Sequence, residues 1–154
     1  MRAVFQRVKS ASVDIVCDAP YRSGEIARGA LVLVAVENGD TEADAEWLAA
    51  KIARMRVFSD AEGKMNLSIK DVGGDVLAVS QFTLFGNMRK GMRPSFNRSA
   101  RPEISVPLYE KFVSFLEREL GKKVPRGVFG AHMEVSLVND GPVTVILDSR
   151  DKDL

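Results

Sequence analysis

An almost unbroken apolar run, Ala30–Val36, restricts the folds that are open to this chain. A run of this length is typical of a β-strand buried on both faces, because a buried helix is usually longer, at about ten residues or more. Further strand-like apolar patterns occur in the segments Ala3–Ile15, Val57–Ser59, Val76–Leu84, Met133–Val138 and Val143–Leu147. The chain is therefore expected to be built around β-sheet.

A helical period replaces the strand pattern in Thr41–Met55. Its apolar residues recur along one stripe at Ala45, Leu48, Ala49, Ile52 and Met55. Thr41 is placed to cap this helix, with Asp44 three residues later as its partner in a capping box. The segment is predicted to be the first of two main helices.

The second helix is predicted to begin at Ser105 or Val106, with Pro107 in its first turn, and to end at Gly121. Because each helix falls between strands, the pattern indicates an α/β protein with mixed β-sheets and two main helices packed on one face. The last two apolar runs are expected to form a hairpin around the turn formers Asn139–Pro142.

The composition fits one soluble domain over residues 1–154, with 45% hydrophobic and 28% charged residues and a net charge of +1. Cys17 is the single cysteine, which excludes an intramolecular disulfide and favours a reducing cytoplasm. The N-terminus becomes polar too early for a signal peptide. No apolar stretch approaches ~18 residues, so no membrane span is expected.

His132 is the only histidine, which excludes a zinc site built on several histidines. A serine-histidine-aspartate triad would have to use His132, and no serine-elbow motif is near it, so a structural or surface role is expected. We expect no metal and no cofactor. If the chain is an enzyme, backbone groups and the substrate must supply much of the catalysis.

Two polar segments, Ser80–Leu84 and Asn139–Thr144, follow or separate apolar runs. With Gln6–Val8, Phe58–Asn66 and Gly91–Phe96 they resemble the D-aminoacyl-tRNA deacylase family over nearly the whole chain. The resemblance implies a layered, barrel-like arrangement of helices and two sheets, built as a homodimer. It also implies hydrolysis of the ester in D-aminoacyl-tRNA, and in mischarged glycyl-tRNA, as chiral proofreading in translation.

From pattern alone, the first polar segment is a strand end that faces solvent or a neighbouring strand. The resemblance implies instead that it lines the pocket for the aminoacylated 3′ adenosine, with the catalytic residues Ser80, Gln81, Phe82 and Thr83. Thr83 is a candidate nucleophile, but no base is visible beside it in the sequence. Water held by the backbone, or the 2′-hydroxyl of the adenosine, ranks above Thr83.

Gly141 and Pro142 belong to an ordinary turn by composition, with a trans bond as the default. The resemblance implies a cis bond that reaches into the partner subunit's active site and excludes L-side chains by collision. Substrate-binding roles are also implied for three other residues. Phe129 would stack on the terminal adenine, Met133 would line the pocket, and Arg7 would lie beside the Gly-Pro segment; core packing is the alternative for Phe129 and Met133.

A long loop over residues 86–102 has no clear period and contains no acidic residue. Its cations are Arg89, Lys90, Arg93, Arg98 and Arg101. They are either simply solvated or contact tRNA phosphates, which need positive charge without base readout. We assign the tRNA contacts to Arg89, Lys90 and Arg93, and expect Lys122, Lys123 and Arg126 to extend the same surface.

Two other functions remain open from the sequence. One is a non-catalytic RNA-binding dimer that uses the basic loop and Phe129. The other is an esterase or amidase acting on small molecules, which would depend little on the loop.

Overall fold

The computed structural model describes residues 1–153. Its strands are β1 (Arg2–Ile15), β2 (Tyr21–Ile26), β3 (Gly29–Ala35), β4 (Phe58–Ser59), β5 (Met65–Leu67), β6 (Asp75–Ser80) and β7 (Met133–Asp148). Its helices are α1 (Glu42–Arg54), the short 3₁₀ helix η1 (Phe82–Phe85) and α2 (Pro102–Leu120). No helix in the described part is long and apolar enough to cross a membrane.

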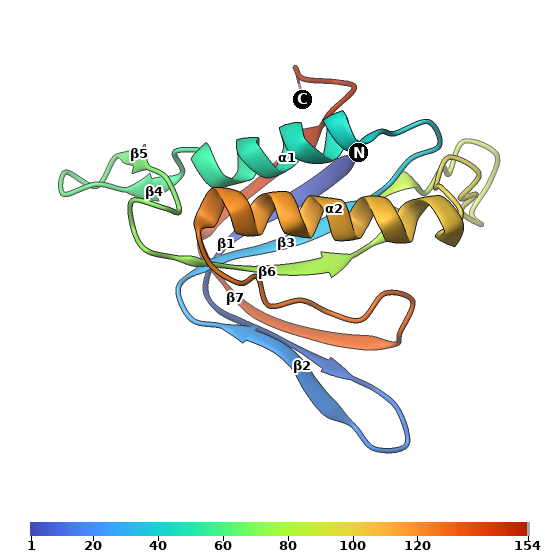
Figure 1. The fold of residues 1–154 in the computed structure, drawn as a ribbon, viewed down its shortest axis with the longest axis horizontal. Coiled ribbons are helices and arrows are strands. Elements are labelled where there is room, and N and C mark those ends of the chain that lie inside the picture. Colours follow the sequence, from blue (N-terminus) through green and yellow to red (C-terminus); the bar gives the residue numbers. More distant parts are fainter. Residues whose placement is uncertain (154) are drawn as a thin grey trace.

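The main sheet is mixed and curls around its long strand β1 (Figure 1). One edge of β1 pairs antiparallel with β3 along its first half and with β2 along its second half. The other edge pairs with β7 over almost the full length of both strands. β6 pairs with β3 in parallel. The predicted α/β class with a mixed, barrel-like sheet is confirmed.

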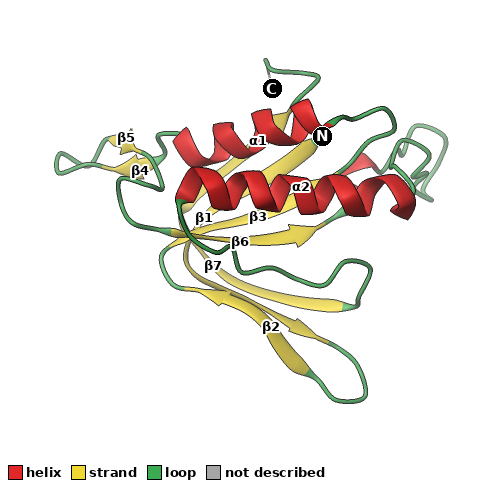
Figure 2. Cartoon of the chain, in the orientation of Figure 1, coloured by secondary structure: helices red, strands yellow, loops and turns green. Residues whose placement is uncertain are grey.

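The helices α1 and α2 lie side by side on one face of this sheet, as predicted (Figure 2). Residues of both helices and of the sheet beneath are almost fully buried: Leu48, Ile52, Phe112, Leu116, Phe5 and Val32. Removing apolar surface of this size from water is the main stabilising term for such a layer. Thr41 caps α1, and the Asp44 carboxylate accepts hydrogen bonds from its backbone N–H (2.8 Å) and hydroxyl (2.9 Å), which confirms the capping-box partner.

The second helix begins earlier than predicted. It starts at Pro102 and not at Ser105 or Val106, so Pro107 lies inside the helix and not in its first turn. Pro102 occupies the first helical position, where the missing N–H costs nothing. The helix ends where it was expected to, because Gly121 adopts the left-handed conformation with φ of 70°.

The predicted strand Val76–Leu84 is wrong in its second half. β6 ends at Ser80, and the chain then turns into η1. Its neighbour β3 stops at Ala35, so no strand is left to pair with residues beyond Ser80. The turn places Phe85 in the interior with only 2% of its surface exposed.

The predicted C-terminal hairpin is also wrong. β7 is one strand whose two halves both pair with β1, which is long enough to accept both. The register moves from Val8 opposite Asn139 to Gln6 opposite Thr144, so β7 uses five residue steps where β1 uses two. The turn formers between these pairs therefore make a bulge that leaves the sheet, not a reversal of direction.

Candidate active site

A pocket of about 290 Å³ opens where β6 ends. Val34–Val36 at the end of β3 and Tyr109 of α2 form part of its wall, which is mostly apolar. Of the residues singled out in the sequence, the pocket is lined by Ser80, Gln81, Phe82, Phe129 and Met133. The fold thus brings together two predicted segments that are about fifty positions apart in the chain.

The pocket turn, residues 80–85, combines the end of β6 with η1. The backbone N–H of Gln81 donates to the carbonyl of Val34 at 2.7 Å and is therefore used within the sheet. The N–H groups of Phe82 and Thr83 donate to no group in residues 1–153. The first N–H groups of a helical turn lack internal partners, so these two donors stay available to a ligand.

Thr83 is exposed and does not line the pocket. Its hydroxyl accepts a hydrogen bond from the side-chain amide of Gln81. No histidine, lysine or carboxylate in the described chain hydrogen-bonds to this hydroxyl. The structure therefore gives Thr83 no base that would activate it as a nucleophile.

The aromatic side of the pocket consists of Phe129 and Tyr109, whose ring centres are 6.0 Å apart and tilted. Tyr109 is 2% exposed and donates its hydroxyl to the carbonyl of Ala78 at 3.2 Å. Burial raises the pKa of Tyr109 well above its usual range, so the phenol stays protonated and serves as a donor. Phe129 packs against the core, is half-buried and lines the pocket.

Sequence reasoning missed Tyr109, which lies among the apolar residues of α2. It also missed His132, which lines the pocket just before β7 and is itself exposed. The carbonyl of His132 accepts from Val16 N–H at 3.0 Å, which fixes the backbone but leaves the imidazole facing solvent. The only signal for His132 in the sequence was its position between Phe129 and Met133.

Arg7 lies beside the Gly141–Pro142 segment. It is 8% exposed, and its Nε donates to the carbonyl of Asp140 at 3.1 Å while its Nη1 donates to the carbonyl of Val57 at 2.5 Å. The Asp140 carboxylate is 3.2 Å from the same Nε. Arg7 therefore fixes the base of the bulge in β7, and it does not reach the pocket of its own chain.

Gly141 and Pro142 are joined by a cis bond and are exposed at the tip of this bulge. Gly141 has a φ of 131°, which L-residues with a side chain rarely adopt, and a Cβ there would lie 2.8 Å from Nη2 of Arg7, so a larger residue would be strained at this position. Neither residue lines the pocket of its own chain.

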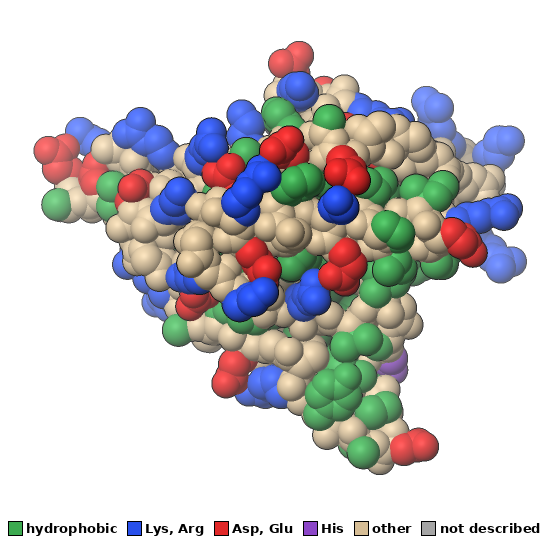
Figure 3. All heavy atoms as spheres, in the orientation of Figure 1, with side chains coloured by type: hydrophobic (Ala, Val, Ile, Leu, Met, Phe, Trp, Pro, Cys, Tyr) green, Lys and Arg blue, Asp and Glu red, His purple; other side chains and the backbone are tan. Residues whose placement is uncertain are grey.

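The basic loop, residues 86–101, projects from the molecule near the start of α2, where Lys and Arg side chains gather (Figure 3). Arg89, Lys90 and Arg93 are exposed and have no acidic partner among the described residues. Arg98 differs, because Glu37 binds it.

The expected extension of this surface by Lys122, Lys123 and Arg126 is wrong. Lys122 and Lys123 follow the C-terminus of α2, whereas the loop precedes its N-terminus, nineteen residues away along the helix. All three cations are paired with acids: with Asp75 at 2.6 Å, with Glu117 at 3.2 Å and with Glu110 at 2.6 Å, in that order.

No group of three or more histidine, cysteine or acidic side chains within the described residues is arranged to hold a metal ion. The chemical groups that the pocket offers are thus backbone N–H donors, hydroxyl and amide side chains, one imidazole and an apolar, partly aromatic wall. Such a set can hold a planar base and an ester, and it can stabilise a developing oxyanion.

Comparison with known proteins identifies relatives over the whole length. The family model for D-Tyr-tRNA(Tyr) deacylase matches residues 4–148. A D-aminoacyl-tRNA deacylase of Dechloromonas aromatica is 54% identical over 150 residues, which cover 97% of this chain and 98% of that protein. One of Porphyromonas gingivalis (strain ATCC 33277) is 53% identical over 153 residues, covering 99% of this chain and 100% of the relative.

Two solved structures share the fold. The c-Myc DNA unwinding element binding protein aligns with a TM-score of 0.87 and 36% identity, covering 96% of this chain and 98% of that one. A probable eukaryotic D-amino acid tRNA deacylase aligns over the same shares with a TM-score of 0.81. Its identity is 18%, so it shows likeness of fold alone.

Proposed function

The chain belongs to the D-Tyr-tRNA(Tyr) deacylase family and is a hydrolase of the ester bond in D-aminoacyl-tRNA, and we propose that it carries out this reaction in the pocket at the end of β6. The products are free tRNA and the D-amino acid. The observation that carries the proposal is the meeting of the pocket turn with Phe129 and Met133 in one mostly apolar pocket.

In the proposed complex, the terminal adenine stacks on Phe129 and the aminoacyl ester lies along the pocket turn. Water attacks the ester carbonyl, the bond to the ribose oxygen breaks, and the ribose oxygen leaves with a proton. The free N–H groups of Phe82 and Thr83 would stabilise the oxyanion. Removal of one such donor typically costs about 10²–10³ in rate, so these donors supply a large part of the catalysis.

The nucleophile in this scheme is a water molecule, oriented by the backbone or by the adenosine 2′-hydroxyl. Thr83 ranks lower, because its hydroxyl only accepts from Gln81 and has no base. Ser80 and Gln81 contribute their polar side chains to the wall that holds the ester. The reaction needs no metal or cofactor.

We propose that the active unit is a homodimer in which Gly141 and Pro142 of one subunit enter the pocket of the other. In support, the bulge that carries them is exposed and held by Arg7, away from the pocket of its own chain. Within residues 1–153, β7 pairs with no strand other than β1, so its second edge is open there. Nearby apolar side chains are exposed: Leu137, Val138 and Ile146. A long open edge of this kind is a template for pairing with another chain.

The inserted segment would serve as a steric filter. Backbone atoms of Gly141 and Pro142 would occupy the position of an L-side chain, so D-aminoacyl and glycyl groups would fit and L-aminoacyl groups would collide. Arg89, Lys90 and Arg93 would bind tRNA phosphates outside the pocket, since they are exposed and unpaired within the described chain. We place the reaction in the cytoplasm, carried out by one domain over residues 1–154.

The test of this function compares D-Tyr-tRNA with the ethyl ester of D-tyrosine as substrates, with and without EDTA. We expect fast release of tyrosine from the tRNA, little from the ethyl ester, and no effect of EDTA. Equal turnover of both esters would favour the small-molecule esterase. Tight tRNA binding without any turnover would favour the non-catalytic RNA-binding dimer.

A further inference from the structure

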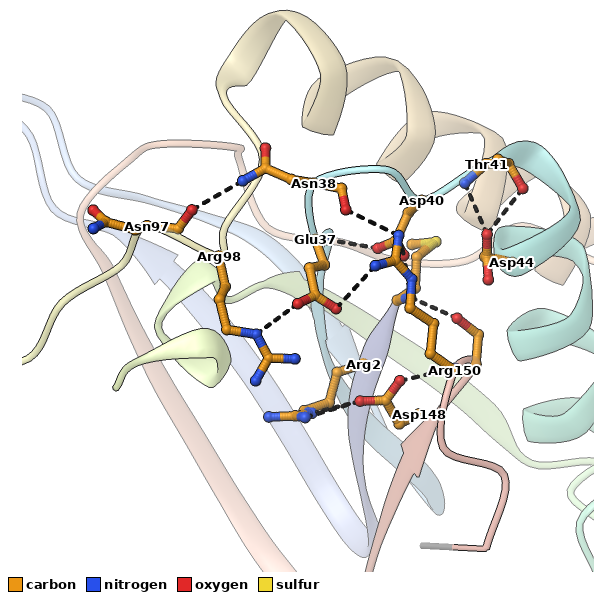
Figure 4. Close-up of polar contacts among 12 residues, drawn as sticks. Arg2, Glu37, Asn38, Asp40, Thr41, Asp44, Asn97, Arg98, Asp148 and Arg150 are labelled. Atoms are coloured by element: carbon orange, nitrogen blue, oxygen red, sulfur yellow. Dashed lines mark hydrogen bonds and ion pairs between the residues drawn. The ribbon is translucent and has the colours of Figure 1, made fainter. Parts of the chain in front are cut away.

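One cation of the basic loop, Arg98, forms an ion pair with a buried carboxylate. Arg98 donates its Nε to Oε1 of Glu37 at 2.6 Å (Figure 4). Its guanidinium carbon lies 5.4 Å from the centre of the Phe85 ring. Glu37 directly follows the wall of the pocket at Val36, and its side chain is only 10% exposed. Phe85 is the last residue of the pocket turn.

A second arginine reaches the same ring from β1. The guanidinium carbon of Arg2 lies 4.8 Å from the centre of the Phe85 ring, and its Nη1 donates to the carbonyl of Leu84 at 3.1 Å. Asp148 holds Arg2 in place through two contacts of 2.9 Å. Two ion-paired arginines therefore contact the C-terminal end of the pocket turn.

The two residues that follow Arg98 are attached to the pocket as well. The hydroxyl of Ser99 donates to the carbonyl of Phe82 at 3.0 Å. The N–H of Ala100 donates to the carbonyl of Val36 at 3.0 Å, and both of these residues line the pocket. The return of the basic loop is thus one wall of the site.

We propose that the ion pair between Glu37 and Arg98 positions the pocket turn for deacylation, so that both are positioning residues and Arg98 is not a tRNA ligand. The proposal rests on the function proposed above. It separates Arg98 from Arg89 and Arg93, which lie in the same loop and have no acid beside them in the described chain.

The expected effect is on rate and not on stability. The Arg98 side chain is 53% exposed, and the buried Glu37 carboxylate keeps a second cation, Arg150, at 3.6 Å, so loss of Arg98 should change the free energy of unfolding little. The pair between Glu37 and Arg98 holds the turn whose N–H groups face the reacting ester. A displacement of catalytic groups by about 1 Å costs on the order of 10²-fold in rate.

The experiment measures single-turnover release of tyrosine from D-Tyr-tRNA, and separately the Kd for the tRNA. For Arg98→Ala and Glu37→Gln we expect a single-turnover rate lower by about tenfold to a hundredfold, with a Kd within about threefold of the wild type. Glu37 also lies 3.6 Å from Nη1 of Arg150, so the double variant should fall no further than Glu37→Gln alone, which already removes the contact with Arg98. Arg98→Lys keeps the charge and should recover part of the rate.

Two controls are matched to Arg98. Arg93→Ala removes an unpaired arginine of the same loop, one that we assign to tRNA binding, and should raise Kd. Arg54→Ala breaks the ion pair with Glu119, far from the pocket, and should change neither the single-turnover rate nor Kd. A higher Kd with an unchanged rate in Arg98→Ala, additive losses in the double variant, or no change at all would each overturn the proposal.

A readout without catalysis separates this proposal from the proposed function. Hydrogen exchange of the peptide that covers residues 80–86 should be faster in Arg98→Ala than in the wild type, and unchanged in Arg93→Ala. If the wild type releases no D-tyrosine, the proposed function fails, but the exchange experiment still tests whether the ion pair between Glu37 and Arg98 holds the pocket turn. Equal exchange in Arg98→Ala and the wild type would contradict it.

Discussion

At the scale of single residues, neither Thr83 nor Tyr109 is placed to act as a nucleophile or a base in the site. Thr83 has a hydroxyl without a base, and Tyr109 has a phenol that burial keeps protonated. In the proposed mechanism the oxyanion donors are the N–H groups of Phe82, which lines the pocket, and of Thr83 beside it; any residue other than proline would supply them. Chemistry of this kind leaves only a weak trace in residue types.

Substitution of Thr83 by alanine is expected to retain most of the activity, because the backbone N–H of residue 83 survives the change. The single-turnover rate on D-Tyr-tRNA should fall by less than about tenfold, as only the hydrogen bond to Gln81 is lost. Thr83→Ser is the matched control and should behave as the wild type. Complete loss in Thr83→Ala, with the fold intact by circular dichroism, would make Thr83 the nucleophile.

Asp40 is a buried carboxylate that pairs with the α-amino group of Met1. Its Oδ1 lies 2.9 Å from the α-amino nitrogen of Met1 and 3.1 Å from Nη2 of Arg150, although neither contact has hydrogen-bond geometry. Its Oδ2 accepts from the N–H of Glu37 at 2.5 Å. Loss of this carboxylate would leave the buried ammonium of Met1 without its counter-charge.

Asp40→Asn is therefore expected to lower the free energy of unfolding by about 3–5 kcal/mol, measured by urea titration. Arg54→Gln, at an exposed ion pair with Glu119, is the control and should cost about 0–1 kcal/mol. Equal, small losses in both variants would show that the buried pair contributes no more than a surface one.

At the scale of secondary-structure elements, the local sequence pattern predicted those elements that depend on residues close together in the chain. The run at β3, the stripe and cap of α1, and the glycine that ends α2 were all predicted. Each depends on neighbours within a few residues, which is the range over which sequence patterns are informative.

The errors arose where a distant strand decided the outcome. β6 ends at Ser80 because β3 ends opposite it, and β7 is continuous because β1 is long enough to pair with both halves. Neither fact is visible in the turn formers near Pro142 or the apolar residues near Phe82. For the same reason, the sequence indicated Ser80, Phe129 and Met133 but not the pocket contacts of Tyr109 and His132.

The C-terminal end of α2 has a pH-dependent contact. The carboxylate of Glu117 accepts from the N–H of Val124 at 3.1 Å, and this bond, with Lys123 nearby, holds the pKa of Glu117 below its usual range. A folded pKa that is lower than the unfolded one adds stability above the unfolded value, and this stability is lost as the pH falls through the folded pKa.

Glu117→Gln should therefore be less stable than the wild type at neutral pH, and the difference in unfolding free energy should shrink below about pH 4. The measurement is urea unfolding of both proteins over pH 3 to 7, taken in steps of about one unit. Glu110→Gln, at an exposed ion pair with Arg126, is the control. A difference that stays constant over this pH range would show that the carboxylate charge is not responsible.

At the scale of the whole molecule, the parts that the proposed function brings together lie apart within one chain. The pocket turn and Phe129 form the pocket, while Gly141 and Pro142 lie on an exposed bulge that does not reach it. The open edge of β7 offers a surface through which a second copy would bring the bulge of one chain to the pocket of the other. Chiral selection would then be a property of the dimer.

Replacement of Pro142 by alanine is expected to preserve folding, since Pro142 is exposed and its ring contacts no core cluster. It removes part of the surface that would collide with an L-side chain. The ratio of D-Tyr-tRNA to L-Tyr-tRNA deacylation rates should fall by about tenfold or more, the effect of losing a steric penalty of roughly 1.4 kcal/mol. An unchanged ratio in a folded, dimeric variant would end the steric-filter account.

The most direct test of the central claim is the release of tyrosine from D-Tyr-tRNA and L-Tyr-tRNA by the purified protein, side by side and with EDTA present. The account predicts rapid release from the D-form alone, from a pocket of backbone donors that is closed to L-side chains by the second subunit. Release from both forms would contradict the role given to Gly141 and Pro142, and release from neither would contradict the deacylation itself.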